Sequence, residues 1–387
     1  MIQGLFGALQ IFLAIRVVLR FVRTAGGDRI KVADEFRPER VSVILPVLNE
    51  AVRIEGCLEC LMNQPETVVE ILVADGGSSD GTQSMVERCR LRDRRVRLID
   101  ASPVPGDWTG KVWGLYTGLK NADPESQWVL SVDADVRCSP QLVPSLLAHA
   151  ERTGLSTFSL AARQHLSGFA DALLHPSLLT TLVYRFGMPG QATRDLHQVQ
   201  ANGQCLFSRR ETLLRTDALR AAQHSLCEDI TLVRRLAECG EHIGFYESAG
   251  LVSTSMYSDW HETWHNWPRS LPTRDCYFGW REAIGLLEVL LVQALPLPLF
   301  AAARALNIPD WLVATNAGIA LIRLGVLVGV ARAYERRPWT YWLSPLLDLP
   351  VAVRLVTSAL RRRQSWRGRL YVRRMGGVFE PLDKAET

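Results

Sequence analysis

The chain has 387 residues, 48% of them hydrophobic, so it can form one large domain or two smaller ones with ample core. Its formal charge of +4 is small, and the basic residues gather near the two apolar ends of the chain. This distribution excludes nucleic acid as a partner, because no long basic stripe is present in the sequence. The eight cysteines are scattered without a zinc-binding pattern, which favours free thiols.

Residues 1–23 are predicted to form a membrane anchor. The segment GLFGALQIFLAIRVVLRFV is long enough to cross a bilayer, which takes about 20 residues. Arg16 and Arg20 lie in its last third, where their long side chains can reach the membrane surface. No small-residue cleavage site follows, so an uncleaved anchor is favoured over a signal peptide, and an interfacial helix is the remaining alternative. Residues 24–40 are typical of a polar linker.

Residues 41–255 are predicted to form an α/β domain. Short β-branched runs alternate with segments that carry apolar residues at helical spacing. Four such pairs in about 110 residues indicate a mostly parallel sheet covered by helices. The predicted strands are Val41–Leu45, Val68–Ala74, Val96–Ile99 and Trp128–Val132, and the predicted helices are a segment from Glu50, Gln83–Leu91, Val112–Leu119 and Pro140–His149.

Polar residues follow these strands directly, at the edge of the sheet where ligands of α/β proteins bind. Asn49 and Glu50 follow the first strand, and the run VADGGSSDGT follows the second. Within that run Asp75 precedes two glycines and is placed to accept a hydrogen bond from a nucleobase N–H. Asp80 is more typical of a cap for the next helix.

The run VLSVDADV places Asp133 and Asp135 one residue apart, after an apolar strand. Alternate residues of an extended segment point to the same side, so the two carboxylates can share a hard cation such as Mg²⁺ or Mn²⁺. Such an ion would neutralise a diphosphate as it leaves. A turn with two solvated aspartates is the alternative.

Two further charged positions are predicted at helix starts. Lys111 enters a helix behind a glycine, where it suits a phosphate, although a solvated surface lysine is an equal alternative. Glu228 and Asp229 open an amphipathic helix, where acidic residues ordinarily compensate the helix dipole. Asp229 is also the candidate for a general base that takes the proton of an acceptor hydroxyl.

Residues 256–283 are predicted to form an amphipathic segment at the membrane surface. Trp260, Trp264 and Trp267 are spaced by four and three residues, which places them on one side of a helix. Tryptophan favours membrane interfaces, and this segment directly precedes an apolar stretch, so an interfacial helix is favoured over core packing. Arg269 on the same segment could bind a diphosphate oxygen.

Residues 284–334 are predicted to form a transmembrane helical hairpin from Ile284–Leu306 and Trp311–Tyr334. The linking residues contain no lysine or arginine, whereas arginines crowd the other side, so the positive-inside rule places the α/β domain in the cytosol. Residues 335–387 are predicted to be an interfacial or re-entrant segment, Tyr341–Leu360, followed by a basic cytosolic tail.

Two ionisable residues, Glu288 and Arg323, lie inside the predicted hairpin. A charged side chain in a bilayer is costly unless it is paired or near water. We expect either an ion pair between these two residues or a role for them in a lipid-accessible cavity.

The order of these motifs resembles family 2 of the nucleotide-sugar-dependent glycosyltransferases, which have the GT-A fold. The resemblance spans about residues 41–267. Its motifs are PVLNE at 46–50, VADGGSSDGT at 73–82, GK at 110–111, DAD at 133–135, NGQ at 202–204 and ED at 228–229.

The resemblance implies roles for single residues. Asp75 would contact the nucleotide base, while Asp133 and Asp135 would hold the ribose, the divalent cation and the diphosphate, with Asp135 as the metal ligand. Asp229 would be the general base of an inverting, in-line displacement, with Arg269 stabilising the departing nucleoside diphosphate. The remaining donor-binding positions are Pro46, Asn49, Glu50 and Lys111, and the acceptor-binding positions are Asn202, Gly203, Gln204, Glu228, Trp264 and Trp267.

The acceptor is expected to be a membrane lipid. Processive members of the family and ceramide glucosyltransferases carry a Gln/Arg-x-x-Arg-Trp motif where this chain has WHNWPRSL. The absence of that motif and the small number of membrane segments argue against a polymer-extruding synthase and favour a single transfer. The flanking segments and the WRGRLY tail resemble bacterial enzymes that glycosylate hydroxylated carotenoids, with hopanoid-associated relatives close by. This resemblance implies transfer of glucose from UDP-glucose at the inner membrane. Polyprenyl phosphate, a hopanoid, sterol or sphingolipid alcohol, and a non-catalytic nucleotide-sugar-binding regulator are the alternatives.

Overall fold

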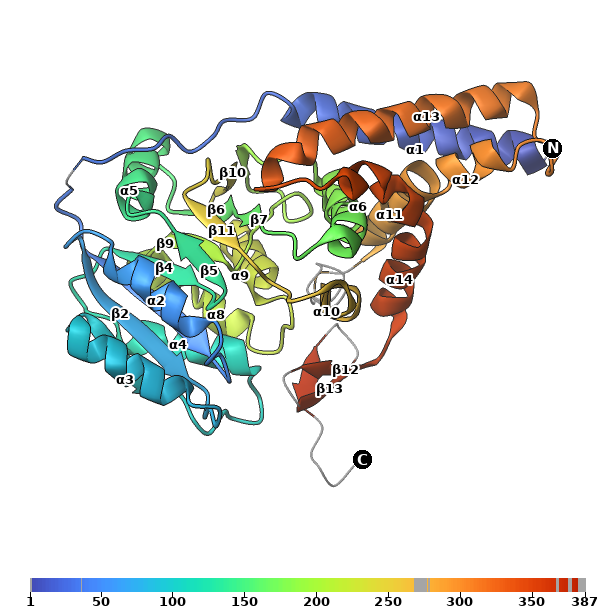
Figure 1. Cartoon of the computed structure of the whole chain (residues 1–387). Helices are drawn as coiled ribbons and strands as arrows, with labels where there is room; N and C mark the ends of the chain where they lie inside the picture. Colours follow the sequence, from blue (N-terminus) through green and yellow to red (C-terminus); the bar gives the residue numbers. More distant parts are fainter. Residues whose placement is uncertain are drawn as a thin grey trace.

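The computed structural model describes residues 2–35, 37–267, 277, 279–366, 369–374 and 378–381. A domain built on a β-sheet lies beside a group of apolar helices (Figure 1). The N-terminal helix α1 (Ile2–Thr24) packs among the C-terminal helices, although more than 250 residues separate them in the chain. The apolar ends of the sequence therefore form one unit, and the polar middle forms the other.

The main sheet has eight strands in the order β3-β2-β1-β4-β9-β6-β10-β8. Strands β3, β2, β1 and β4 run parallel, as the alternation of strand and helix predicted, and β9 and β8 are antiparallel to their neighbours. The strands are β1 (Val41–Val47), β2 (Val68–Asp75), β3 (Val96–Asp100), β4 (Trp128–Val132), β6 (Thr157–Ala161), β8 (Gln191–Thr193), β9 (Cys205–Arg209) and β10 (Ile243–Glu247).

Helices cover both faces of this sheet, because its inner strands are apolar on both sides. In β1, Val43 and Leu45 belong to one buried cluster and Ile44 to another, as the alternation of side chains along a strand requires. The first face is covered by α2 (Ile54–Met62), α3 (Thr82–Arg92) and α5 (Leu142–Thr153), and the second by α4 (Gly110–Asn121), α7 (Arg210–Thr216), α8 (Ala218–Ala221) and α9 (Glu228–Glu238).

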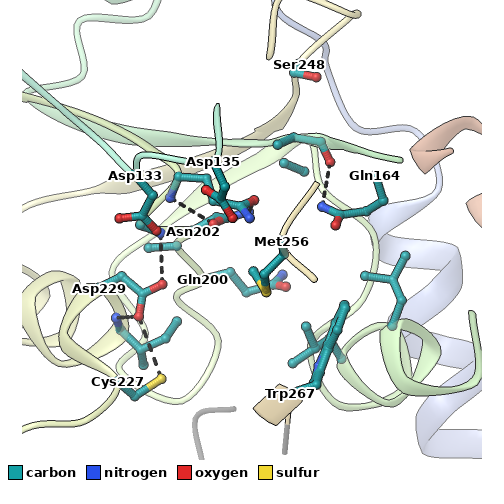
Figure 2. Close-up of a pocket in the computed structure, with 18 of the residues that line it drawn as sticks. Asp133, Asp135, Gln164, Gln200, Asn202, Cys227, Asp229, Ser248, Met256 and Trp267 are labelled. Atoms are coloured by element: carbon teal, nitrogen blue, oxygen red, sulfur yellow. Dashed lines mark hydrogen bonds between the residues drawn. The ribbon is translucent and has the colours of Figure 1, made fainter. Parts of the chain in front are cut away.

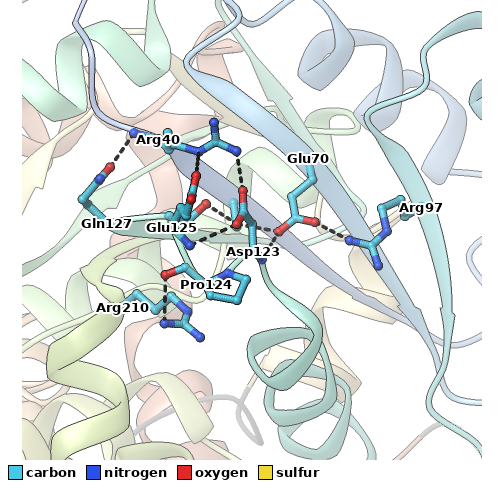
Figure 3. A network of polar contacts seen from close by, with 10 residues as sticks. Arg40, Glu70, Arg97, Asp123, Pro124, Glu125, Gln127 and Arg210 are labelled. Carbon is cyan, nitrogen blue, oxygen red and sulfur yellow. Dashed lines mark hydrogen bonds and ion pairs between the residues drawn. The ribbon is translucent and has the colours of Figure 1, made fainter.

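A polar network joins the amino ends of the parallel strands, at the edge away from the carboxyl ends (Figure 3). Glu70 of β2 accepts a hydrogen bond of 2.6 Å from Arg97 of β3 and one of 2.6 Å from the backbone N–H of Asp123. The backbone N–H of Arg40 donates to the Gln127 side chain at 2.7 Å, just before β1 and β4 begin. These bonds fix the strand register, and they leave the opposite edge free for binding.

A small sheet lies next to the carboxyl ends of the strands. It consists of β5 (Val136–Cys138), β11 (Val252–Thr254) and β7 (Arg163–Gln164), in that order. Because β5 begins one residue after Asp135, its pairing with β11 holds the loop that carries Asp133 and Asp135.

Within the described residues, four helical stretches are long and apolar enough to cross a membrane. The first is α1. The second runs through α11 (Trp280–Glu288), the π-helix η2 (Val289–Ala294) and α12 (Pro296–Ala301); the third through α13 (Asp310–Gly329) and η3 (Val330–Ala333); the fourth through η4 (Trp339–Leu347) and α14 (Asp348–Leu360). The fourth includes the segment predicted to be interfacial, and that placement stays a prediction.

Helix α6 (Phe169–Phe186) lies between the sheet domain and the apolar helices, against which it packs through η4, η2 and α14. The short helix α10 (Trp260–Asn266) also packs on α6. The described part of the tail forms a small antiparallel sheet of β12 (Arg363–Trp366), β13 (Arg369–Arg373) and β14 (Phe379–Pro381).

The predicted ion pair between Glu288 and Arg323 is wrong. Glu288 is fully buried and accepts hydrogen bonds from Arg16 at 2.9 Å and Arg20 at 2.8 Å, both on α1. Arg323 instead pairs with Asp348 of α14, with two contacts of 2.7 and 3.0 Å. The sequence could not show this, because the partners come from segments that only the packing of the helices brings together.

Candidate active site

A cavity of about 800 Å³ opens at the carboxyl ends of β1 and β4. Figure 2 shows Asp133, Asp135, Asn202 and Asp229 on one side of it and Trp267 on the other. The predicted site residues in its wall are Pro46, Glu50, Lys111, Asp133, Asp135, Asn202, Gly203, Gln204, Glu228, Asp229 and Trp267. Asn49, Asp75 and Trp264 stand outside this wall, and Arg269 lies outside the described residues.

Asp75 ends β2 and is buried, with its carboxylate directed to its own loop. It accepts hydrogen bonds from the backbone N–H of Ser78, at 3.1 and 3.2 Å, and from the Gln83 side chain. The neighbouring Gly76, not Asp75, lines the cavity. The predicted contact of Asp75 with a nucleobase therefore stays a prediction, and in this conformation Asp75 shapes the loop.

Asn49 also acts within the loops. Its side chain accepts the backbone N–H of Ser79 at 2.9 Å, so it joins the loop after β1 to the loop after β2. Asp80 accepts the N–H of Thr82, the first residue of α3, at 3.0 Å, as expected for a residue that caps this helix, although Gly81 holds the N-cap position. These bonds preorganise the wall around Glu50.

Asp133 and Asp135 lie in the loop between β4 and β5, as the motif predicted. Asp135 has one carboxylate oxygen, Oδ1, that is buried and has no hydrogen-bond partner within the described residues. Burial, together with the nearby charge of Asp133, raises the pKa of the Asp135 carboxyl to about 6. A buried, unsatisfied carboxylate oxygen is costly, and a bound cation would remove that cost.

The residues present fit a divalent cation held by the aspartate pair. No group of three His, Cys, Asp or Glu side chains suited to a metal occurs in the described ranges. Diphosphate oxygens suit Mg²⁺ and Mn²⁺, so a bound donor would supply further ligands to an ion at Asp135. Asp133 and Asp135 both border the cavity, so a bound donor can reach them.

Lys111, the second residue of α4, joins two carboxylates. Its ammonium group lies 2.8 Å from Asp133 and 2.7 Å from Glu228. Despite its burial, these charges hold the pKa of Lys111 well above its usual value, with Asp133 the larger contributor, so the side chain stays charged. The prediction of a direct phosphate contact remains untested, but an ion pair replaces the alternative of a solvated lysine.

Gly203 lies close against the ion pair. A Cβ atom at this position would lie 3.0 Å from the Lys111 ammonium and 3.3 Å from Glu228 Oε1, so a larger residue would require both groups to shift slightly. The backbone N–H of Gly203 donates to Asp229 Oδ2 at 2.9 Å. Gly203 therefore connects the lysine pair to the predicted base.

Asp229 lies in the first turn of α9 and is half-buried at the cavity wall. Its second oxygen accepts the N–H of Ile230 at 2.8 Å. Burial, and next the charge of Glu228, raise the pKa of the Asp229 carboxyl to about 7, against the opposing effects of Lys111 and the two backbone N–H groups. A carboxylate with a pKa near neutrality is suited to accept a proton at physiological pH.

Asn202 and Gln204 bond mainly to each other and to the scaffold. The Asn202 amide donates to Gln204 at 2.8 Å, and Gln204, which is buried, donates to Thr254 of β11 at 3.2 Å. Both residues border the cavity, but these bonds hold the turn that contains Gly203, just before β9. Their predicted role in acceptor binding stays a prediction.

Trp267 and Trp264 differ in position. Trp267 is buried and borders the cavity, with its ring 4.2 Å from the His175 ring of α6. Trp264 packs against the apolar cluster around α6, and the Arg354 guanidinium lies 5.8 Å from its ring. Trp260 remains exposed. The predicted aromatic face is thus divided between core packing and the cavity wall.

The apolar wall of the cavity was missed from the sequence. Leu179, Leu182, Val183 and Phe186 of α6 form part of it, with Met188 just beyond the helix. Their spacing of i, i+3, i+4 and i+7 marks one face of a helix and could have identified the stripe. It was missed because α6 lies outside every motif of the polar site.

Comparisons with known proteins agree with this geometry. The family model of Glycosyl transferase family 2 matches residues 42–214. The solved mannosyltransferase of Pyrobaculum calidifontis, in complex with GDP-Man and Mn²⁺, superposes with a TM-score of 0.53 at 19% identity, covering 92% of this chain and 98% of that one. The α/β domain therefore has the GT-A fold with a mostly parallel sheet.

Curated relatives match over shorter stretches. An undecaprenyl-phosphate 4-deoxy-4-formamido-L-arabinose transferase of Proteus mirabilis is 31% identical over 116 residues, which is 29% of this chain and 34% of the relative. A GalNAc(5)-diNAcBac-PP-undecaprenol beta-1,3-glucosyltransferase of Campylobacter jejuni is 36% identical over 60 residues, 16% of this chain and 19% of that protein. The chain thus spans about a third or less of the length of these two relatives. Residues 42–214, less than half of the 387-residue chain, thus match the model of Glycosyl transferase family 2 and lie in a domain with the GT-A fold.

Proposed function

We propose that the protein is a membrane-bound glycosyltransferase that moves a single sugar from a nucleotide-sugar to a hydroxyl group of a membrane lipid. One observation carries the proposal. A single cavity has acidic strand-end residues at one side and an apolar wall from α6 and the end of α13 at the other. A polar donor and an apolar acceptor can therefore meet in it.

The chain's residues divide the chemistry between them. A Mg²⁺ or Mn²⁺ ion bound at Asp133 and Asp135 would supply positive charge to the diphosphate leaving group. Asp229 accepts the proton of the acceptor hydroxyl while the oxygen forms a bond to the anomeric carbon. The bond from that carbon to the diphosphate oxygen breaks, and its electron pair leaves with the nucleoside diphosphate. This single displacement inverts the anomeric configuration.

Lys111 holds the donor side of the site and the side of the general base in a fixed relative position. Its ion pairs with Asp133 and Glu228 join the donor side to the residue next to Asp229. The bond from Gly203 to Asp229 then fixes the direction of the base. This arrangement supports direct transfer, because the base and the metal-binding pair are held by one connected set of charged groups.

A hydroxylated carotenoid is the acceptor that we propose first, and UDP-glucose the donor, on the resemblance of the membrane segments. Hopanoid, sterol and sphingolipid alcohols share the required chemistry. The second candidate acceptor is polyprenyl phosphate, because one relative is named for undecaprenyl phosphate and another for a diphospho-undecaprenol. A phosphate acceptor needs no strong base, so the two candidates differ in their dependence on Asp229.

We also propose that the α/β domain faces the cytoplasm at the inner membrane. Three arginines, Arg332, Arg336 and Arg337, closely follow α13 on the side of the sheet domain, whereas the loop between α12 and α13 contains one, Arg304. This asymmetry follows the positive-inside rule.

The test uses membranes containing the full chain, radiolabelled UDP-glucose and a hydroxycarotenoid. A labelled polar pigment is expected from the wild type and from Asp34→Asn, a control at an exposed linker position. The pigment should be lost in Asp229→Asn. Undiminished product from Asp229→Asn would overturn the assignment of the base. No labelled lipid from any nucleotide-sugar would overturn the proposed function itself.

A further inference from the structure

The helix α6 has two faces of opposite character. Ser177 and Thr180 face the apolar helices, where Ser177 donates to Asp348 at 2.6 Å and Thr180 accepts from Gln293 at 3.0 Å. Leu179, Leu182 and Phe186 lie roughly half a turn away at 100° per residue and border the cavity. The polar face is thus bonded within the protein, whereas the apolar face borders the cavity.

This apolar stripe meets the end of a candidate membrane span. Val183 of α6 and Val330, just after α13, belong to the same buried cluster, with Leu179 and Met188 packed against it. All four residues also border the cavity. The apolar part of the cavity is therefore formed at the junction of α6 with the third apolar stretch.

Gly329 marks the place where this junction opens. It is the last residue of α13, it is exposed, and it also borders the cavity. A Cβ atom there would meet only Met188, at 3.6 Å, which is ordinary van der Waals contact. Gly329 therefore belongs both to the exposed surface of the span and to the wall of the cavity, with no side chain between them.

The geometry points to an apolar subsite at Leu179, Leu182, Val183, Phe186, Met188 and Gly329 that receives the hydrocarbon chain of the acceptor directly from the bilayer. The inference rests on the proposed function. It commits to the chain of the acceptor as the occupant, because the same cavity reaches Asp229 and the acidic pair. Gly329 then sets the width of the entrance, and larger side chains at this position exclude the lipid.

The chain offers a matched control for this position. Gly325 lies one turn earlier on the same side of α13 and is also exposed, and a Cβ atom there would have nothing within 4 Å. Leucine is a better helix former than glycine, so Gly329→Leu and Gly325→Leu should both fold. Only the first places its side chain at the cavity.

The catalytic test measures three reactions of full-length protein in lipid nanodiscs. For Gly329→Leu we expect kcat/KM with the membrane lipid to fall by about tenfold or more, because the leucine side chain would occupy the entrance and a single methylene in an apolar pocket changes discrimination by about 10- to 200-fold. Transfer to a short water-soluble alcohol and slow hydrolysis of the donor should stay within about twofold of wild type. Gly325→Leu should match wild type in all three. Equal loss in both variants, or no loss in Gly329→Leu, would overturn the inference.

A second test does not depend on catalysis. A long-chain alcohol carrying a diazirine, added to nanodiscs and photoactivated, should label the peptide that contains Leu179–Met188 in wild type and in Gly325→Leu. Labelling should fall several-fold in Gly329→Leu. Equal labelling of this peptide in all three proteins would overturn the subsite, whereas normal labelling of a protein without transferase activity would overturn only the proposed function.

Discussion

Replacing Asp229 with asparagine should have opposite effects on activity and on stability. The carboxylate accepts two backbone N–H groups, from Gly203 at 2.9 Å and Ile230 at 2.8 Å. Asparagine keeps one acceptor oxygen, so one of these bonds is lost, at a cost of about 1–3 kcal/mol in unfolding free energy. The variant also cannot take up a proton from the acceptor, and loss of a general base lowers the rate by about 10²- to 10⁴-fold.

The electrostatic contribution to the unfolding free energy favours Asp229→Asn over the wild type. In the folded protein the pKa of Asp229 rises from 3.8 to about 7, so ionisation of the folded state is penalised. That penalty grows as pH rises from the unfolded pKa to the folded pKa, and is complete above it. A rise of about three units in the pKa of Asp229 corresponds to a loss of about 4 kcal/mol in the unfolding free energy of the wild type. At pH 8 Asp229→Asn should therefore be more stable than wild type by about 1–3 kcal/mol, and at pH 5 this advantage should be nearly gone.

The assay combines thermal unfolding of the metal-free protein in detergent with a pH–rate profile. The wild-type kcat/KM should rise about tenfold per pH unit up to pH 7 and level off above it, because Asp229 must be ionised to act as a base. The midpoint difference between the two proteins should increase from pH 5 to pH 8. A variant with activity within tenfold of wild type would refute the base assignment. A midpoint difference that is independent of pH would refute the electrostatic reasoning.

Three more outcomes are expected. Lys111→Met leaves two carboxylates without their cation, so unfolding free energy should fall by about 3–5 kcal/mol and donor affinity should fall with it, measured by thermal shift and by titration of the nucleotide-sugar. Asp348→Ala leaves Arg323 buried without its partner and should lower stability by a similar amount in detergent, where an unchanged midpoint would contradict the pair. The sulfurs of Cys60 and Cys138 lie 2.9 Å apart. Diamide should therefore oxidise this pair of thiols to a disulfide, taking up the two electrons. Peptide mapping should detect the disulfide in wild type but not in Cys138→Ser.

The sheet and the acidic motifs could be predicted from the sequence, because both follow from local patterns. The runs before Asp75 and Asp133 are apolar and β-branched, which indicates strands, and a polar residue at a strand end marks the edge of the sheet. The spacing of Asp133 and Asp135 is also local. These features depend on neighbouring residues and not on contacts with distant segments of the chain.

Features that depend on packing between distant segments could not be predicted. Nothing near Lys111 in the sequence shows that Glu228, more than 100 residues later, would share its charge with Asp133. Asp75 was expected to face a ligand, yet its loop closes back so that Ser78 donates to it. Both the Lys111 ammonium and the Asp75 carboxylate form hydrogen bonds within the protein. Their partners are determined by the tertiary structure.

Double-mutant cycles can distinguish two ion pairs within the apolar helices, Glu288 with Arg323 and Asp348 with Arg323. A contact between Glu288 and Arg323 was one of two alternatives that the sequence left open. In the structure Glu288 pairs with Arg16 and Arg20, and Arg323 pairs with Asp348. Groups that share no partner contribute additively, so a double-mutant cycle of Glu288→Gln with Arg323→Met should show a coupling energy below about 0.5 kcal/mol. The cycle of Arg323→Met with Asp348→Asn should show about 0.5–3 kcal/mol. The reverse order of the two coupling energies would refute the arrangement of α1, α11, α13 and α14, and with it the placement of the apolar wall that α6 presents to the cavity.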